Sequence, residues 1–330
     1  MHTLRNDLRY AARSLRKSPL FTAVVVLTLA PGICWMIVRQ VLLVAMIGVA
    51  CGFMAAATFT SSLSALFFGV TRFDLHTSFS AALAAPLIEH EQKWLPELAP
   101  RLPLPIPVPV RVGLPGQGFP WSWSVVPWLT GLPAAVEPPH DAAAAAVTLA
   151  TFVCALHRPA PDNAPRNPVR GVPLADRAAA VHARTTDLDG LVNRTVVLDL
   201  WEKVVGTPTW SGPPLWIHGD LHAGNVLVDR GRISAVIDFG DLTAGDPATD
   251  LSIAWTLLPA TARSIFRTSV TELSGWVDGE TWIRARGWAL ALGLAFLASS
   301  RDNQLMSLMG RTAIDAVLSE TEIRGVASPK

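Results

Sequence analysis

Three polar side chains have the types and the spacing of a phosphoryl-transfer site. Asp220 and Asn225 are five positions apart, and Asp238 begins a later Asp-Phe-Gly segment. Phosphoryl transfer needs one Asp to orient the attacking hydroxyl and accept its proton, while an Asn and a second Asp hold Mg²⁺ on the nucleotide phosphates. Kinases place these residues in the same order, with the base and the Asn five apart. The pattern therefore predicts chemistry on ATP with Mg²⁺.

The segments around these side chains predict how they are brought together. Two short apolar runs, Val226–Val228 and Ile233–Ile237, flank the turn Asp229-Arg230-Gly231. Apolar runs joined by a few turn residues that include Gly are typical of a β-hairpin. Such a hairpin fixes Asp220 and Asn225 at one end and returns Asp238 beside them.

The same stretch resembles a known family. The motifs HGDLHAGNVL, IDFGD and DPATDLS resemble the core of the aminoglycoside phosphotransferase family, small-molecule kinases of the protein-kinase-like fold, and the resemblance covers about residues 85–320. It implies that Asp220 is the catalytic base and that Asn225 and Asp238 are the magnesium ligands. It gives His218 and Asp250 supporting roles, with Asp250 bracing the catalytic loop from the following helix.

The resemblance also divides the chain. It implies an α+β fold in which residues 85–135 are the nucleotide lobe and hinge, and residues 136–324 are the helical catalytic lobe. Val125, Val126 and Trp128 are then expected beside the adenine. Glu91 (or Glu89) is expected to be the helix acid that pairs with a strand lysine in this family.

That lysine is missing, and so is a Gly-rich phosphate loop. The chain has four lysines, and none lies in a strand ahead of the Glu91 helix: Lys17, Lys93, Lys203 and Lys330. The amino-terminal lobe is therefore predicted to be truncated. Because catalysis in such a site is mostly positioning and charge stabilisation, we expect nucleotide affinity and turnover to fall. An active kinase that phosphorylates an antibiotic-like or other small alcohol and an inactive pseudokinase or fusion remnant both remain open.

The first seventy residues predict a membrane anchor. Residues 19–38 and 41–70 carry no charge, and each run is long enough for a helix that crosses a bilayer. The basic segment 1–18 predicts a cytoplasmic amino terminus, so two crossings leave the kinase-like lobe facing the cytoplasm, after a linker at 71–84. A buried core helix, or a cleaved signal peptide for the first run alone, are the other interpretations.

Residues 1–84 have a resemblance of their own. The stretches DLRYAARSLRKSPLFTAVVVLTLAPG and VRQVLLVAMIGVACGFMAAATFTSSLSALFFGVTRFD resemble fragments of macrolide-export-type ABC transporter permeases. The resemblance implies a fusion without transport machinery. It also leaves a third hypothesis, a membrane component related to export permeases.

Composition bears on the partners. The net charge is +1, which argues against nucleic-acid binding because a nucleic-acid binder shows a basic face. Residues 136–330 carry twenty-one acids against seventeen bases, a small excess that suits a cationic acceptor. The Pro-rich stretch Ala155–Arg177 carries four arginines, and it is either a wall of the acceptor pocket, as the resemblance implies, or a solvated loop. The sequence does not identify the small-molecule hydroxyl acceptor.

Overall fold

A computed structural model describes residues 77–116, 121–299 and 302–320. The chain divides into two compact units, Met1–Leu75 and His76–Lys330, and the described residues all belong to the second. The predicted membrane helices and the permease-like stretch up to residue 76 lie outside the described residues. Across the described ranges, no helix combines the length and the apolar character that crossing a membrane requires.

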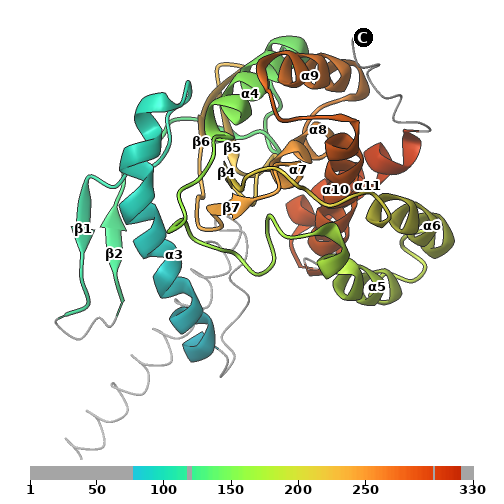
Figure 1. The fold of residues 1–330 in the computed structure, drawn as a ribbon, viewed down its shortest axis with the longest axis horizontal. Coiled ribbons are helices and arrows are strands. Elements are labelled where there is room, and N and C mark those ends of the chain that lie inside the picture. Colours follow the sequence, from blue (N-terminus) through green and yellow to red (C-terminus); the bar gives the residue numbers. More distant parts are fainter. Residues whose placement is uncertain (1–76, 117–120, 300–301, 321–330) are drawn as a thin grey trace, which may run out of the picture. The chain divides into compact units, whose positions relative to one another are not determined.

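The unit opens with a long helix and a short hairpin (Figure 1). Helix α3 spans Thr77–Leu98, is followed by a 3₁₀ turn at Ala99–Arg101, and extends into the segment assigned to the linker. Strands β1 (Arg111–Gly113) and β2 (Trp123–Val125) pair antiparallel. Gln92 of α3 donates to the Trp123 carbonyl over 2.9 Å, which ties the helix to β2.

The predicted central hairpin is confirmed. Strand β5 (Val226–Asp229) pairs antiparallel with β6 (Arg232–Val236), and β3 (Leu132–Pro133) adds a third strand beside β5. Arg230 and Gly231 both have positive φ, 51° and 74°, as a two-residue hairpin turn of type I′ requires. The hairpin thus fixes the separation between its entry, at Asn225, and its exit, at Asp238.

A second strand pair holds the two chain segments that flank the hairpin. Strand β4 (Leu215–Ile217) pairs antiparallel with β7 (Thr243–Gly245), so that Ile217 lies opposite Thr243. All three residues of β4 are buried. The residues directly after β4 and directly before β7 are consequently neighbours, and both segments carry the motif's polar side chains.

Helices form the rest of the unit. They are α4 (Ala142–Leu156), the 3₁₀ helix η2 (Leu174–Arg177), α5 (Ala178–Asp187), α6 (Arg194–Val205), α7 (Ala248–Leu251), α8 (Ile253–Thr256), α9 (Ala260–Leu273), α10 (Gly279–Ser299) and α11 (Gln304–Ser319). In Figure 1, α5, α6, α10 and α11 lie on the side of the β4 and β7 pair away from β1 and β2, and α4 and α9 lie above the strands. Asp141 caps α4 by accepting hydrogen bonds from two backbone N–H groups. Helix α10 is buried along most of its length and is the centre of the core, with Trp282 and Trp288 fully enclosed.

Candidate active site

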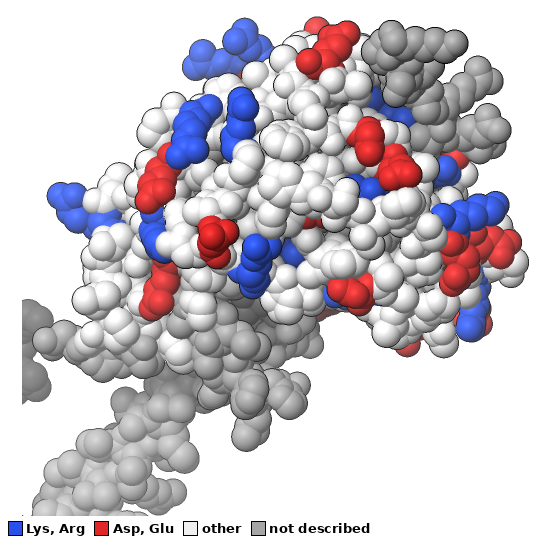
Figure 2. Space-filling view, viewed as in Figure 1, with Lys and Arg blue, Asp and Glu red and all other residues white. Residues whose placement is uncertain are grey.

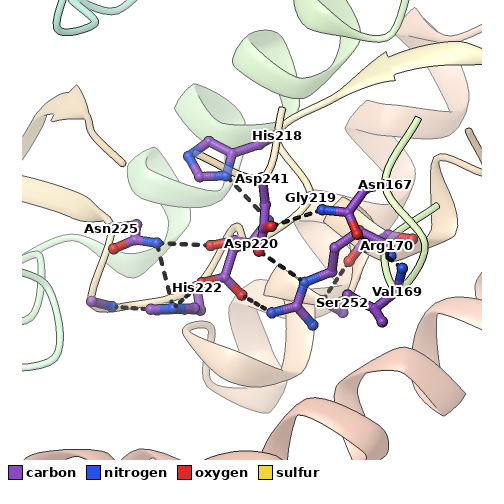
Figure 3. Close-up of polar contacts among 12 residues, drawn as sticks. Asn167, Val169, Arg170, His218, Gly219, Asp220, His222, Asn225, Asp241 and Ser252 are labelled. Carbon is purple, nitrogen blue, oxygen red and sulfur yellow. Dashed lines mark hydrogen bonds and ion pairs between the residues drawn. The ribbon is translucent and has the colours of Figure 1, made fainter. Parts of the chain in front are cut away.

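Asp220 lies on the loop between β4 and β5, and its carboxylate is held by Arg170 and His222 (Figure 3). Its Oδ1 accepts from Arg170 Nη2 over 2.7 Å, and its Oδ2 accepts from His222 Nε2 over 3.2 Å. Burial alone would raise the pKa of Asp220, but the charge of Arg170 and the bond from His222 hold it well below the usual range of an Asp. The carboxylate is therefore ionised at neutral pH.

The backbone of this loop is fixed by a fully buried carboxylate. Asp250, from α7, accepts hydrogen bonds from the backbone N–H groups of His218 (2.7 Å) and Gly219 (2.9 Å). His157, at the end of α4, lies 3.1 Å from the same carboxylate. Three segments distant in the sequence thus converge on one side chain, which leaves the loop little freedom to move.

His218 links the loop to the segment that carries Asp238. Its Nδ1 accepts from the backbone N–H of Asp220 over 3.2 Å, so the proton of a neutral ring lies on Nε2. Nε2 then donates to the carbonyl of Ile237 over 3.0 Å. The ring also packs against Phe239, with 4.5 Å between the ring centroids. His218 therefore joins the backbone N–H of Asp220 to the carbonyl of Ile237, the residue before Asp238.

Asn225 is buried at the entry to the hairpin. Its side-chain Nδ2 donates to the backbone carbonyl of Asp220 over 2.9 Å. The backbone carbonyl of Asn225 accepts from the backbone N–H of Ile237 over 2.9 Å. The first bond uses the donor end of the side-chain amide. The oxygen, Oδ1, has no hydrogen-bond partner within residues 77–116, 121–299 and 302–320 and remains available as a ligand.

Asp238 has a backbone conformation that is uncommon for a residue with a side chain. Its φ is 64°, in the left-handed region, and the side chain reaches solvent. The carboxylate has no hydrogen bond or ion pair with any described residue. Surrounding protein atoms and the negative charge of Asp220 together raise its pKa. A cation placed here would relieve both effects.

Glu91 lies beside Asp238. Burial raises the pKa of Glu91 to about 7, the charge of Asp238 adds to the rise, and a hydrogen bond from the backbone of Phe239 opposes it. The lysine that this glutamate pairs with in the family was predicted to be missing. In the described part of the chain, its close ionisable neighbour is a second carboxylate.

The predicted adenine contacts are exposed. Val125 and Val126 end β2 and begin the connection to β3, and they are 47% and 44% exposed. Trp128 follows on this connection and is 88% exposed. They form an open apolar surface, and their contact with adenine stays a prediction.

Arg170 is the site residue that the sequence analysis missed. It lies on the loop between α4 and η2, where its Nε donates to Asp241 over 3.2 Å while Nη2 holds Asp220. Asn167 donates to the other oxygen of Asp241 over 2.7 Å. The sequence signal was four arginines in one Pro-rich loop, and nothing local distinguishes Arg170 from the other three.

The side chains fit magnesium bound together with a nucleotide rather than alone. Asn225 Oδ1 and the Asp238 carboxylate are oxygen acceptors without partners among the described residues, and Mg²⁺ prefers oxygen ligands. No group of three or more His, Cys, Asp or Glu in the described ranges forms a ready-made metal cage. Phosphate and water oxygens would complete the coordination, as in kinase sites.

Comparison with known proteins decides the family. The family model described as "Phosphotransferase enzyme family" matches residues 71–288 of this chain. The chain belongs to this family. The match confirms the predicted aminoglycoside-phosphotransferase-like core and starts at residue 71, within the segment assigned to a linker. The α+β content of the chain agrees with the predicted protein-kinase-like fold.

Individual relatives match parts of the chain. It is 26% identical over 138 residues to an aminoglycoside 3'-phosphotransferase of Escherichia coli, which covers 41% of this chain and 51% of the relative. It is 34% identical over 65 residues to the uncharacterized protein YcbJ of Bacillus subtilis (strain 168), which covers 19% of this chain and 21% of the relative. The chain thus spans about half, or less, of these curated relatives.

Solved structures also resemble the chain. The GDP complex of wild-type aminoglycoside 2'-phosphotransferase-IIIa has a TM-score of 0.49 and 18% identity, and the match covers 71% of this chain and 82% of that chain. The apoenzyme of macrolide 2'-phosphotransferase MphH from Brachybacterium faecium has a TM-score of 0.44 and 20% identity, covering 72% and 80%. The resemblance of residues 1–84 to ABC export permeases gains no support from these comparisons.

Proposed function

We propose that the protein is a kinase that transfers the γ-phosphoryl group of ATP to a hydroxyl of an antibiotic-like or other small alcohol. Family membership supports the reaction class. The observation that carries the proposal is the arrangement of acceptors around Asp220. An ionised, fixed carboxylate lies beside two oxygen groups without partners in the described ranges, Asn225 Oδ1 and the carboxylate of Asp238.

In this proposal Asp220 orients the acceptor hydroxyl. Its low pKa makes it a weak base, so its main contribution is to hold the hydroxyl oxygen in line for attack and to take the proton late. The bonds from Arg170 and His222 fix the carboxylate before the acceptor binds. Such preorganisation is the main source of rate in phosphoryl transfer, where the transition state is loose.

Asn225 and Asp238 would hold Mg²⁺ on the nucleotide phosphates. When bound, the ion neutralises charge that develops on the transferred group and on the leaving oxygen. Asp250 and His218 would act as supports, because the first holds the loop backbone and the second joins it to the carbonyl of Ile237.

The surroundings of Glu91 favour a second candidate, a pseudokinase that binds nucleotide poorly. Glu91 lies beside Asp238, and the positive charge that would bind the α- and β-phosphates was predicted to be absent. An inactive protein would keep the fold of the helical lobe and its loop geometry, yet lack turnover. Binding and turnover must therefore be measured separately.

The test is Mg²⁺-dependent nucleotide binding by calorimetry on the full chain, with ATP and GTP. We expect Asp238→Ala and Asn225→Ala each to weaken Mg²⁺-nucleotide binding by at least about tenfold, because each removes a charged or oriented oxygen ligand. Asp229→Ala is the matched control, since it removes a 42% exposed carboxylate at the opposite end of the same hairpin. Equal affinity in all four proteins would contradict the proposal. Tight binding without ADP release in the presence of any alcohol would favour the pseudokinase.

The membrane anchor stays part of the proposal. The uncharged runs 19–38 and 41–70 support it, and they lie outside the described residues. We expect the full chain to sediment with membranes and to resist extraction by alkaline carbonate. Recovery of the chain in the high-speed supernatant of a lysate would refute the anchor.

A further inference from the structure

His222 lies on the same loop as Asp220, and its ring and the guanidinium of Arg170 lie on either side of the Asp220 carboxylate (Figure 3). The two carboxylate oxygens are held separately. Oδ1 accepts from Arg170 Nη2 over 2.7 Å, and Oδ2 accepts from His222 Nε2 over 3.2 Å. Rotation of the carboxylate about its last bond would break both contacts. The pair of donors therefore sets the plane of the carboxylate, while each oxygen keeps a lone pair for the acceptor.

The loop itself fixes the tautomer of His222. The backbone carbonyl of His222 accepts from the backbone N–H of Asn225 over 2.9 Å, which closes a tight turn. Within this turn, the backbone N–H of Gly224 donates to Nδ1 of the His222 ring over 3.0 Å. Nδ1 is therefore an acceptor without a proton, so the ring is neutral and its proton lies on Nε2. This N–H is the group that donates to Asp220.

Packing holds the ring of His222 in one orientation. The residue is fully buried, and its ring lies edge-on against Phe296 of α10, with 4.9 Å between the ring centroids and 76° between the ring planes. A half-turn of the ring would put carbon atoms where Nδ1 and Nε2 now lie, so both hydrogen bonds would be lost. The ring thus presents one donor in one direction.

The same tautomer separates His222 from the proposed metal ligand. Nδ2 of Asn225 lies 3.4 Å from Nε2 of His222. Because Nε2 carries the proton that is donated to Asp220, it does not accept from Asn225. The amide of Asn225 is oriented instead by the backbone carbonyl of Asp220. His222 therefore acts on the carboxylate that orients the acceptor and leaves the magnesium side to other groups.

We propose that His222 is a positioning residue for phosphoryl transfer: its neutral ring, fixed by its own turn, holds the Asp220 carboxylate in the plane in which it meets the acceptor hydroxyl. This rests on the proposed kinase function. Arg170 contributes a charge and one contact, whereas His222 contributes the second contact without adding a charge. Because positioning is the main source of rate in this reaction, loss of the second contact should lower kcat more than nucleotide affinity.

The first experiment tests the tautomer without any turnover. Two-dimensional NMR is recorded on the full chain with nitrogen-15-labelled histidine, and the signals of His222 are identified by their absence in His222→Gln. We expect a protonated Nε2 and an unprotonated Nδ1. The Nε2 proton should move upfield in Asp220→Asn, because a neutral amide is a weaker acceptor than a carboxylate. A proton on Nδ1, or an Nε2 proton that does not respond to Asp220→Asn, would overturn the proposal.

The second experiment replaces the ring by side chains that keep different parts of it. His222→Gln places an amide nitrogen near the position of Nε2 and keeps a donor for Asp220. His222→Asn places an amide oxygen near Nδ1 and keeps only the acceptor for Gly224, and His222→Phe keeps only the packing on Phe296. ADP release from ATP is followed with kanamycin, erythromycin, glucose and water alone. We expect kcat to fall by at least about tenfold in the Asn and Phe variants and to stay within about threefold in His222→Gln, with little change in the KM for ATP.

The order of the three variants separates positioning from packing. If the ring only filled space, His222→Phe would be the most active and the most stable to urea, since it retains the contact with Phe296. Activity that is highest in His222→Phe, or unchanged in all three variants, would therefore refute the positioning role. His182→Gln is the control, because this histidine is 48% exposed on α5 and its variant should match the unchanged protein. Absence of turnover in the unchanged protein would contradict the kinase function, while the NMR experiment would still confirm or refute the geometry assigned to His222.

Discussion

The guanidinium of Arg170 lies 2.7 Å from the carboxylate of Asp220, although fifty residues separate them in the sequence. The pair is partly enclosed, with 18% and 17% of the two side chains exposed, so solvent screens it less than a surface ion pair. Arg170 also bonds Asp241. Arg170 therefore keeps Asp220, the residue proposed to orient the acceptor, in its ionised state. The same guanidinium group also fixes the position of the Asp220 side chain. In the view of Figure 2, charged side chains of both signs are scattered among uncharged ones.

Replacing Arg170 should change how Asp220 titrates. In Arg170→Gln we expect the pKa of Asp220 to rise, because the largest effect that opposes desolvation is lost. A carboxylate whose pKa is lowered in the folded state stabilises the protein above its unfolded pKa, and this stability is lost as pH falls through the folded value. The variant should thus be less stable than the unchanged protein by about 1–3 kcal/mol at pH 7, and the difference should shrink in acid.

Carbon-13 NMR of the Asp carboxyl groups and urea unfolding from pH 3 to 8 measure both effects. Arg170→Lys is the matched variant, since it keeps the charge but not the two-pronged contact, and we expect it to restore most of the low pKa. If Asp220 titrates identically in all three proteins, Arg170 does not control it.

The raised pKa of Glu91 predicts that the stability of the metal-free protein falls, rather than rises, with increasing pH. Its pKa is raised to about 7, so the folded state favours its neutral form. A carboxyl group of this kind stabilises the fold fully below its unfolded pKa, near 4.5, and loses that contribution as pH rises through about 7. In the presence of a chelator we expect the free energy of unfolding to fall between pH 5 and 8 by on the order of 1–2 kcal/mol, after allowing for solvent screening.

Glu91→Gln should remove this decline, because the amide does not titrate. Urea unfolding at pH 5, 6, 7 and 8 with and without the substitution provides the measurement. Glu137→Gln serves as the comparison, since Glu137 lies in the loop before α4, far along the chain from Asp238. Parallel pH curves for the unchanged protein and Glu91→Gln would rule out the contribution of Glu91.

The hairpin and the catalytic loop could be predicted from the sequence because their determinants are local. Asp229-Arg230-Gly231 between two apolar runs specifies a turn, and five residues from Asp220 to Asn225 specify a short loop. The contacts of Arg170 and Glu91 could not be predicted in this way. They join segments far apart in the chain, and each depends on how whole elements pack rather than on spacing.

Two other expectations stay predictions. Helix α3 begins at Thr77, inside the segment 71–84 that was assigned to a linker, and it continues through Pro86 and Pro96. The small excess of acidic over basic residues in 136–330 favoured a cationic acceptor, but a count of charges does not say where those charges lie relative to the site.

Asp250 should be the largest single contributor to the stability of the loop. It is fully buried; its Oδ2 accepts from His218 N–H and lies beside His157 Nε2, while its Oδ1 accepts from Gly219 N–H. Removing a buried acceptor leaves its donors without partners, so Asp250→Ala should lower the free energy of unfolding by about 3 kcal/mol or more. His157→Phe, which keeps a ring of similar size, should cost about 1–3 kcal/mol.

Urea denaturation at pH 7 checks both values, with Asp229→Ala as the exposed-carboxylate control, expected within about 0.5 kcal/mol of the unchanged protein. Nucleotide affinity should fall in Asp250→Ala beyond what the lost stability explains, since the loop that carries Asp220 is released. An Asp250→Ala protein as stable as the Asp229→Ala control would exclude the bracing role.

The buried pair Asp246–Arg284 should couple the core to the site. Arg284 Nε lies 2.7 Å from Asp246 Oδ2, and the side chains of Arg284 and Asp246 are 3% and 4% exposed. Asp246 also accepts from Ala248 N–H at the start of the short helix that carries Asp250. Arg284→Met leaves a buried carboxylate unpaired and should cost about 3–5 kcal/mol. Adding Asp246→Asn removes that unpaired charge, so the double variant should be less destabilised than the sum of the two single variants by about 1–3 kcal/mol.

A double-mutant cycle by urea unfolding measures the coupling directly. Strict additivity would mean that the two side chains contribute independently, and α7 would then need another anchor.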